Sequence, residues 1–309
     1  MVSILMSTYN GAPFLKTQID SILCQTYTGF SLIIRDDGSC DDTLEILNAY
    51  DDPRITVIQG DNLGPADSFF SLLREAPEAD YLFFSDQDDV WYPYKLECML
   101  SQIKAYDDVP AMVFSDFEMI DEMGKRTRDS FYDYAAISVP SGVVGLEKIL
   151  AHPYVFGCAS VINRKLADCL QNPPVGIEMH DCWISLTAAA IGKLVYMPQK
   201  TIAHRFHSRN ATGRKGQANL INRIKRVTTG FSAQVDNSTL RLHQVTLLLE
   251  CYNQELLPEV AHMLTDLSKA MTDGRIATVM TLHKYGIIRQ RRINTFFFYL
   301  TVMCMKGAI

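Results

Sequence analysis

The 309-residue sequence lacks the marks of several large protein classes. No apolar run reaches the ~18 residues that a membrane-spanning helix needs, and the apolar residues 2–6 lead directly into a polar turn, so we expect neither a membrane span nor a signal peptide. The eight cysteines contain no CxxC pair and no zinc-like spacing, which favours reduced thiols in a cytoplasmic protein over a disulfide framework. A net charge of −6 argues against a general attraction to nucleic acid, so no nucleic acid partner is expected.

Two glycine-rich phosphate-binding motifs are also absent. G-x-G-x-x-G after the first strand would indicate a dinucleotide oxidoreductase, and G-x-x-x-x-G-K-[ST] a P-loop enzyme, because glycine lets the backbone approach phosphate closely. The chain has neither. It does have ordinary globular composition, 48% hydrophobic and 21% charged residues, enough for one large α/β domain with an appendage or for two domains.

The first third of the chain alternates between two periodicities. Helical patterns occur near residues 13–25, after Asp41 or Asp42, and over residues 68–75. Strands that alternate with helices in this way imply right-handed βαβ units, and therefore an α/β fold with a mostly parallel sheet flanked by helices. The expected buried strands are residues 2–6, 30–34, 55–58 and 81–84, followed by 111–114, 153–163 and 194–197.

Polar residues follow three of these strands. Asp86, Asp88 and Asp89 come within four residues after the fourth strand. Carboxylates this close repel one another unless a cation lies between them, and a hard divalent ion is the usual partner. A solvated acidic turn is the plainer alternative. Because strand ends of an open α/β sheet meet at a ligand-binding edge, we expect one cleft formed by residues 7–9, 36–37 and 86–89.

Four segments carry a family resemblance. In order, they are residues 7–11 (STYNG), 18–27 (QIDSILCQTY), 35–43 (RDDGSCDDT) and 85–91 (SDQDDVW). Together they look like the successive signatures of family 2 inverting glycosyltransferases, and DQDDVW is similar to the bacterial rhamnosyltransferase branch. The resemblance implies a GT-A fold over residues 1–212, with a nucleotide-sugar half (1–125) and an acceptor half (126–212), before a C-terminal helical region (213–309). It also implies a nucleotide-diphosphate-sugar donor and a Mg²⁺ or Mn²⁺ ion.

The resemblance assigns roles to individual residues. Asp88 or Asp89 would bind the metal, and His207 would close over the metal or the diphosphate. Asp37 would accept a hydrogen bond from the pyrimidine base, and Arg205 would neutralise phosphate charge. A tyrosine of the family pattern is replaced by His204. The full donor set is Ser7, Thr8, Tyr9, Asp36, Asp37, Asn62, Asp86, Gln87 and Arg205, of which Ser7 and Asp37 have turn and capping roles as alternatives.

Asp181 is the candidate catalytic base. An inverting transfer needs a carboxylate that removes the proton of the acceptor hydroxyl as this oxygen attacks. Asp181 matches the family's aspartate at the start of a helix that we expect to begin with Cys182, and a plain N-cap is the alternative role. His180 either orients Asp181 or is a core histidine. Residues 131–142 have an irregular pattern and are expected to form an acceptor loop.

The last third of the chain has a different character. Residues 240–249 and 260–271 have helical patterns, and residues 295–305 are apolar and aromatic. We expect a small helical bundle with the apolar tail as its core. The alternative is a peripheral membrane contact, in which residues 296–299 enter the interface and basic side chains meet anionic headgroups. The basic residues are Arg289, Arg291, Arg292 and Lys306, and an earlier basic stretch holds Arg214, Lys215, Arg223, Lys225 and Arg226.

The residues and the family resemblance together imply a metal-dependent inverting glycosyltransferase, which we expect in the cytoplasm or at the inner face of the cell membrane. The predicted reaction moves L-rhamnose from dTDP-rhamnose to a saccharide acceptor, lipid-linked in one version, in bacterial cell-surface polysaccharide biosynthesis. A UDP-hexose or UDP-N-acetylhexosamine donor is the alternative. A nucleotidyltransferase would need a basic, glycine-rich loop after its first strand, and residues 7–14 contain no basic residue. The intact acids disfavour an inactive binding subunit.

Overall fold

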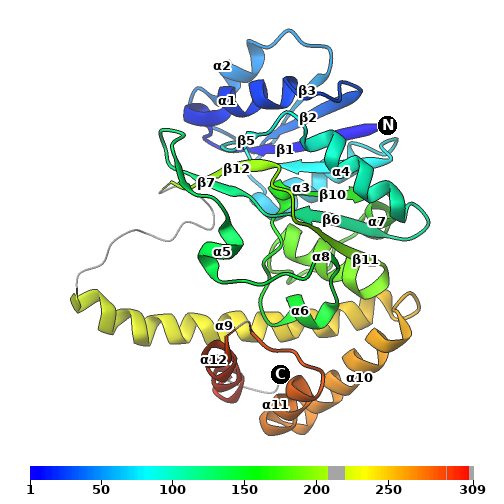
Figure 1. Ribbon diagram of the computed structural model, residues 1–309, viewed down its shortest axis with the longest axis vertical. Helices are drawn as coiled ribbons and strands as arrows, with labels where there is room; N and C mark the ends of the chain where they lie inside the picture. Colours follow the sequence, from blue (N-terminus) through cyan, green and yellow to red (C-terminus); the bar gives the residue numbers. More distant parts are fainter. Residues whose placement is uncertain (208–219, 290, 306–309) are drawn as a thin grey trace.

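A central eight-stranded sheet organises the computed structural model, which describes residues 1–207, 220–289 and 291–305, with the backbone alone for 220–234 (Figure 1). The strand order is β3-β2-β1-β4-β10-β6-β11-β9. Two strands, β9 (Gly142–Val143) and β10 (Ser160–Asn163), run antiparallel to the others. The parallel strands are β1 (Val2–Thr8), β2 (Phe30–Asp36), β3 (Ile55–Gln59), β4 (Tyr81–Ser85), β6 (Ala111–Ser115) and β11 (Lys193–Met197).

Helices cover both faces of this sheet, and the strands are therefore apolar on both sides. Alternate residues enter different cores: Leu5 and Phe84 pack with α3 and α8, whereas Ile4 and Phe83 pack with α1 and α4. This period of two is the expected geometry of a strand buried on both faces. The covering helices are α1 (Ala12–Leu23), α2 (Thr43–Asn48), α3 (Pro65–Arg74), α4 (Lys95–Ile103), α6 (Leu146–Leu150), α7 (Arg164–Cys169) and α8 (His180–Ile191).

The four N-terminal strands and the helices between them confirm the sequence prediction. One later prediction is wrong. Residues 153–163 are not one strand, because the chain turns through a 3-10 helix, Gly157–Ala159, before β10 begins at Ser160. Within residues 131–142, a short helix, α5 (Phe131–Ala135), forms because Ser130 accepts a hydrogen bond from the Asp133 amide and caps it, and the acceptor role of the segment stays a prediction.

A second, four-stranded sheet lies beside the first, with the order β5-β12-β7-β8. It contains β5 (Val90–Trp91), β12 (Ile202–Arg205), β7 (Glu118–Ile120) and β8 (Arg126–Arg128). Strand β12 pairs with β5 directly after the acidic loop, with Ala203 opposite Val90. This pairing brings residues near position 204 to the end of β4, more than 100 positions away in the sequence.

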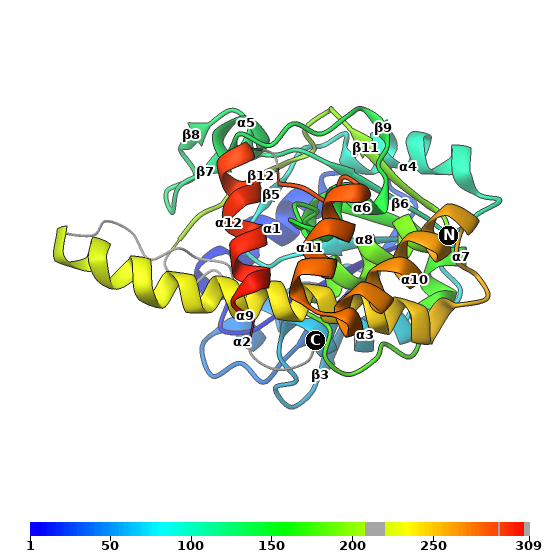
Figure 2. The same cartoon turned by 90° about the horizontal axis from the view of Figure 1, so that it is seen from below.

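Four helices follow, α9 (Leu220–Tyr252), α10 (Pro258–Asp273), α11 (Arg275–Lys284) and α12 (Arg292–Met303). They lie below the sheet in Figure 1, and Figure 2 shows them from beneath. Their apolar residues continue the core around α8. The ring centres of Tyr252 and Trp183 lie 6.0 Å apart in a stacked arrangement. No helix in the described parts of the chain is long and apolar enough to cross a membrane.

The predicted C-terminal helices are present, whereas the boundary near residue 212 stays a prediction. The basic stretch that was singled out in the sequence lies outside the residues whose side chains are described, as does Lys306. Within the apolar tail, Phe298, Val302 and Met305 are buried, but several neighbours are exposed, so the tail is only partly core.

Gly192 offers a test of how tightly α8 is fixed. It caps the C-terminus of α8, and a Cβ atom there would lie 1.9 Å from the Pro110 carbonyl oxygen, which accepts a hydrogen bond from Lys193. We expect Gly192→Ala to lower the free energy of unfolding by about 1–3 kcal/mol, since backbone must move. Urea unfolding measures this. Gly29→Ala is the control, because the nearest atom to its Cβ is 3.4 Å away. Equal effects of the two substitutions would contradict the tight contact.

Candidate active site

Three polar strand ends lie side by side at one edge of the central sheet. Strand β1 sits between β2 and β4 and is parallel to both, with Thr8 opposite Asp36 and Met6 opposite Ser85. The segments that follow β1, β2 and β4 therefore leave the sheet next to one another, as their sequence pattern predicted.

The two aspartates at the end of β2 hold the surrounding loops. Asp36 accepts hydrogen bonds from the Thr8 hydroxyl at 3.1 Å and from the Ser39 amide at 2.9 Å. Asp37 accepts from the amides of Leu63 and Gly64, at 3.0 and 2.9 Å, and also pairs with Arg35. Both aspartates are buried. The capping role is thus present, and the predicted hydrogen bond from a pyrimidine base to Asp37 stays a prediction.

Gln87 connects the end of β1 to the acidic loop. Its amide accepts from the Tyr9 amide at 2.9 Å and donates to the Tyr9 carbonyl at 3.1 Å. Gly11 permits this contact, because a Cβ there would lie 2.1 Å from the Gln87 Oε1 atom. The Tyr9 side chain remains 48% exposed, and Asn62 is exposed as well, so both side chains face solvent at this edge.

The acidic loop is held by two histidines. His207 Nε2 donates to Asp88 Oδ2 at 2.7 Å. His204 Nδ1 donates to Asp89 Oδ1, also at 2.7 Å, and the Arg205 amide donates to the same oxygen at 3.0 Å. Asp89 is fully buried, and its other oxygen, Oδ2, has no hydrogen-bond partner among the described residues. A buried carboxylate oxygen without a partner fits a site for a cation.

The electrostatics of the loop point the same way. Burial, together with the charges of Asp89 and Asp88, raises the pKa of Asp86 to about 8. Burial opposes ionisation of Asp89 as well, but the charge and hydrogen bond of His204 outweigh it and lower its pKa. For His204, burial disfavours the charged form, yet Asp89 prevails and raises the pKa to about 9. A carboxyl group with the pKa of Asp86 is poised to ionise when a cation binds.

One group of potential metal ligands differs from the set that the sequence predicted. Asp86, Asp89, Cys158 and His204 each offer an atom, and these atoms lie within 4.8 Å of one another. Cys158 and His204 were absent from the predicted metal set of Asp88, Asp89 and His207. The replaced family tyrosine was the available signal for His204. Cys158 has no sequence signal, because only the turn before β10 brings it to the loop.

A buried lysine lies behind this group. Lys95 has no exposed surface, donates from Nζ to the Cys158 carbonyl at 2.6 Å, and lies 4.2 Å from the centre of the Trp91 ring. Burial lowers its pKa to about 7, against the opposing influence of nearby acids. The sequence did not single out Lys95, because a lysine at the start of an amphipathic helix is normally expected to be exposed.

The Arg205 side chain forms hydrogen bonds to backbone carbonyl groups of the protein. Its guanidinium group donates to the carbonyls of Asp88 at 2.8 Å, Asp121 at 2.9 Å and Glu122 at 3.2 Å. The group also lies 4.7 Å above the Phe14 ring. Arg205 therefore ties the acidic loop to the loop after β7, and its predicted contact with phosphate stays a prediction.

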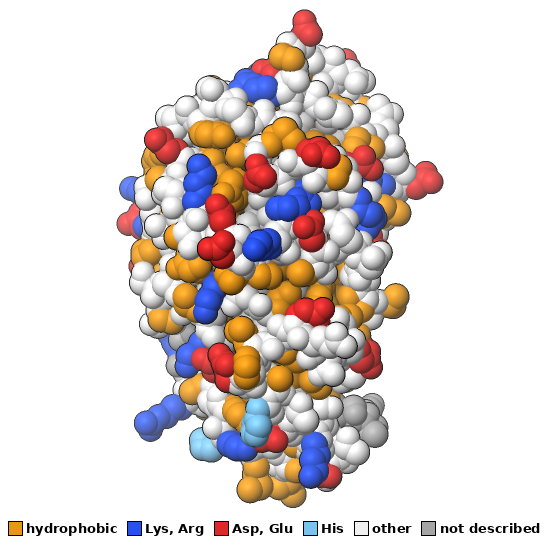
Figure 3. All heavy atoms as spheres, turned by 90° about the vertical axis from the view of Figure 1, so that its right-hand side faces the viewer, with side chains coloured by type: hydrophobic (Ala, Val, Ile, Leu, Met, Phe, Trp, Pro, Cys, Tyr) orange, Lys and Arg blue, Asp and Glu red, His pale blue; other side chains and the backbone are white. Residues whose placement is uncertain are grey.

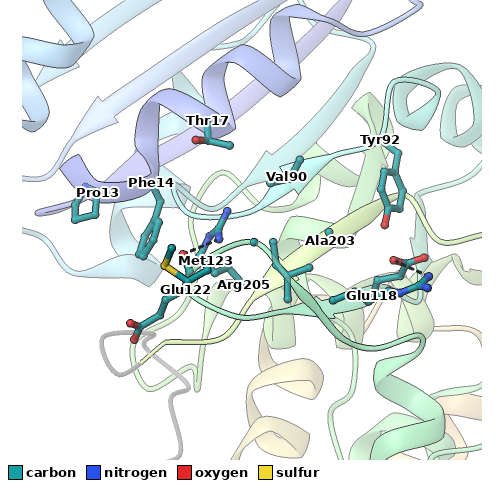
Figure 4. Close-up of a pocket in the computed structure, with 13 residues that line it drawn as sticks. Pro13, Phe14, Thr17, Val90, Tyr92, Glu118, Glu122, Met123, Ala203 and Arg205 are labelled. Atoms are coloured by element: carbon teal, nitrogen blue, oxygen red, sulfur yellow. Dashed lines mark hydrogen bonds and ion pairs between the residues drawn. The ribbon is translucent and has the colours of Figure 1, made fainter.

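Arg205 also lines a groove of about 580 Å³ (Figure 4). Phe14 and Met123 lie at one end with Arg205, and Tyr92 and Glu118 lie at the other end. Sequence reasoning did not find this groove, since its walls come from α1, β5, β7 and β12, whose pairing depends on the three-dimensional packing.

Asp181 lies in the first turn of α8, which begins at His180 and not at Cys182 as predicted. Its Oδ2 accepts from the Gly157 amide at 3.1 Å, and its charge contributes to the raised pKa of Asp86, so the two carboxylates are near each other. His180 stacks on Phe69 at 4.1 Å, and neither ring nitrogen has a hydrogen-bond partner among the described residues. Burial lowers the pKa of His180, which supports the core role.

Helix α9 supports the segment that leads to Asp181. Arg241 donates to both carboxylate oxygens of Glu178 at 2.8 Å, and Gln244 donates to the Gly176 carbonyl at 3.1 Å. Both hydrogen bonds come from one nitrogen, Nη2, and a hydrogen bond between two charged groups is stronger than one between neutral groups. The C-terminal helices thus help to position the start of α8.

Comparison with known proteins gives a family and a fold. The family model described as glycosyl transferase family 2 matches residues 3–184. Residues 1–349 of Staphylococcus aureus TarS in complex with UDP-GlcNAc superpose with a TM-score of 0.57 at 15% identity, covering 92% of this chain and 80% of that one. This likeness shows the GT-A fold that the sequence predicted.

The curated relatives are distant glycosyltransferases. An uncharacterized glycosyltransferase of Rickettsia felis is 27% identical over 53% of this chain, and the match spans only 27% of that longer protein. Escherichia coli UDP-Glc:alpha-D-GlcNAc-diphosphoundecaprenol beta-1,3-glucosyltransferase WfgD is 26% identical, over 60% of this chain and 69% of the relative. Shigella flexneri dTDP-rhamnosyl transferase RfbG is 26% identical, over 67% of this chain and 73% of the relative.

The His204–Asp89 pair predicts non-additive stabilities. With chelator present, His204→Ala leaves a charged, buried carboxylate, and we expect a loss of about 3–5 kcal/mol in the free energy of unfolding. His204→Ala with Asp89→Asn should lose less than His204→Ala alone, because an uncharged amide needs no counter-charge. Urea unfolding of the unchanged chain, the two single variants and the double variant gives the coupling free energy between His204 and Asp89. The exposed His283→Ala is the control, and simple additivity would contradict the pair.

Proposed function

Because this chain belongs to glycosyl transferase family 2, we propose that it transfers a sugar from a nucleotide-diphosphate donor to a saccharide acceptor in the synthesis of a bacterial cell-surface polysaccharide. The observation that carries the proposal is the convergence of Asp86, Asp88 and Asp89 with the ends of β1 and β2. A nucleotide diphosphate needs such an edge, with polar loops for the nucleoside and acids that hold a cation against the phosphates.

We propose dTDP-L-rhamnose as the donor. The DQDDVW segment and the similarity to the Shigella rhamnosyl transferase support this choice. A UDP-hexose is the second candidate, supported by the similarity to the Escherichia coli glucosyltransferase. Both donors present the same diphosphate to the acidic loop, so the choice between them depends on the base and sugar contacts near Ser7, Tyr9 and Asp37.

A divalent ion, Mg²⁺ or Mn²⁺, fits the acidic loop. The residues that would hold it are Asp86, Asp88, the unpartnered oxygen of Asp89, and His207, once His207 releases its hydrogen bond to Asp88. Bound there, the ion would offset the negative charge that grows on the diphosphate as the sugar leaves. His204 and the Arg205 amide keep Asp89 in position for this role.

Asp181 is the proposed base. It lies in the first turn of α8, on an element separate from the acidic loop, and its charge reaches Asp86. Its Oδ2 is oriented by the Gly157 amide, and the Cys182 amide donates to its Oδ1 at 2.8 Å. From this position its carboxylate would take the proton of the acceptor hydroxyl as that oxygen attacks the anomeric carbon.

A lipid-linked saccharide is the proposed acceptor, because the Escherichia coli relative is named for a diphosphoundecaprenol acceptor. Such an acceptor places the reaction at the inner face of the cell membrane, and we propose that the C-terminal helices bring the protein there.

Donor choice is tested by thermal shift with dTDP, UDP, GDP and ADP, each with Mn²⁺ or with chelator. At 100-fold excess over Kd, a bound ligand stabilises by about 2.7 kcal/mol. We expect the largest shift with dTDP and Mn²⁺, and a much smaller one with chelator. A preference for UDP would replace rhamnose by a UDP-sugar, and no metal-dependent shift with any nucleotide would refute the site.

The role of Asp181 is tested by Asp181→Asn. Transfer should fall by about 100-fold or more, since a base contributes this much, while the thermal shift with the preferred nucleotide and Mn²⁺ stays unchanged. Asp51→Asn is the control, because Asp51 is exposed and lies between α2 and β3. Normal transfer by Asp181→Asn with intact donor binding would exclude this residue as the base.

A further inference from the structure

Helices α11 and α12 present large apolar side chains to solvent. Phe296 is 60% exposed, and Ile276 and Met280 are each 67% exposed. Burying such side chains is normally what holds a helix to a protein, so a cluster that remains exposed points to a partner. The residues of this cluster, called the apolar face below, are Ile276, Met280, Ile288, Ile293, Phe296, Phe297, Leu300 and Met303.

Helix α12 is apolar on two opposite sides. Phe298, Thr301 and Val302 are buried, and Thr301 exchanges a hydrogen bond of 2.8 Å with Ser238 of α9. The remaining apolar residues recur at positions 293, 296, 297, 300 and 303, which is the spacing of a single helix stripe. One stripe of α12 thus packs on the protein, and the residues of the second stripe are each 37–60% exposed.

The exposed residues of the two helices belong to one surface. Helices α11 and α12 lie side by side in Figure 2, and the Arg275 side chain of α11 donates to the Met303 carbonyl of α12 at 3.3 Å. Figure 3 shows hydrophobic side chains at the lower tip of the molecule, next to Lys, Arg and His side chains.

The charge of this segment has one sign. Residues 274–305 contain five Lys and Arg residues and no Asp or Glu, in a chain whose net charge is −6. Arg291 and Arg292 are exposed where α12 begins, and Arg275 is exposed where α11 begins. Lys284 is already paired with Asp266 of α10. The apolar face is therefore flanked by cations at the starts of both helices.

We propose that the apolar face docks on a lipid bilayer with anionic headgroups. Aromatic and branched side chains of the face would enter the boundary between headgroups and acyl chains, and the flanking arginines would contact phosphate groups. A second copy of this chain is a poorer occupant, because residues 274–305 offer five Lys and Arg residues and no Asp or Glu, so a like surface supplies no opposite charge. This inference extends the lipid-linked acceptor proposed above, but docking itself requires no sugar transfer.

The test is flotation of the full chain with phosphatidylcholine vesicles, with and without phosphatidylglycerol. We expect the chain to float with the anionic vesicles, to float less with neutral ones, and to be released by salt, which screens the arginines. Phe296→Ser with Phe297→Ser should weaken anionic-vesicle binding by about tenfold or more, because the aromatic area is lost. Arg291→Glu with Arg292→Glu should weaken it to a similar extent.

Val175→Ser is the matched control, since Val175 is 95% exposed and far along the chain from the apolar face. It should bind vesicles as the unchanged chain does. All variants should keep the thermal shift with nucleotide and Mn²⁺, which separates a failure of docking from a failure of the proposed function.

Three results would overturn the proposal. The first is an absence of binding to anionic vesicles by the unchanged chain, and the second is equal binding to neutral and anionic vesicles. The third is a dimer in light scattering that Phe296→Ser with Phe297→Ser converts to monomer, which would assign the face to a second copy.

Discussion

Electrostatic repulsion within the acidic loop is the constraint on which the site depends. Three carboxylates follow β4 within four residues, and their burial and mutual repulsion raise the pKa of Asp86 to about 8. The protein alone compensates this charge only in part. His204 pairs with Asp89 and His207 pairs with Asp88. The Oδ2 atom of Asp89 has no hydrogen-bond partner among the described residues. A divalent cation bound to a diphosphate would reduce the repulsion between these carboxylates.

The rest of the fold holds this loop from several directions. Strand β12 supplies both His204 and Arg205, and the arginine joins the loop to the carbonyls of Asp121 and Glu122. Helix α8 adds Asp181, and α9 fixes the approach to α8 through the pair between Arg241 and Glu178. The C-terminal helices are therefore part of the support of the site as well as the proposed contact with the membrane.

The sequence predicted most of what lies at the ends of β1, β2 and β4. An apolar run followed by polar or acidic residues can be interpreted as a buried strand with a polar end from the sequence alone. It predicted less where distant segments meet. Cys158 and Lys95 lie behind the loop through contacts between α4 and the turn before β10, which no local pattern announces. The chain turns through a 3-10 helix at Gly157, whose amide donates to Asp181, so the expected strand over residues 153–163 is shortened. The cap of α5 was readable from Ser130 and Asp133 but was overlooked.

The most direct test of the central claim is titration of the chain with Mn²⁺ followed by electron paramagnetic resonance, in which free Mn²⁺ gives the signal and bound Mn²⁺ loses it. The account predicts that dTDP or UDP, added to the chain, increases the uptake of Mn²⁺ to one ion per chain, and that Asp88→Asn abolishes this increase. Uptake that is unaffected by nucleotide, or that survives in Asp88→Asn, would contradict a metal and diphosphate site in the acidic loop.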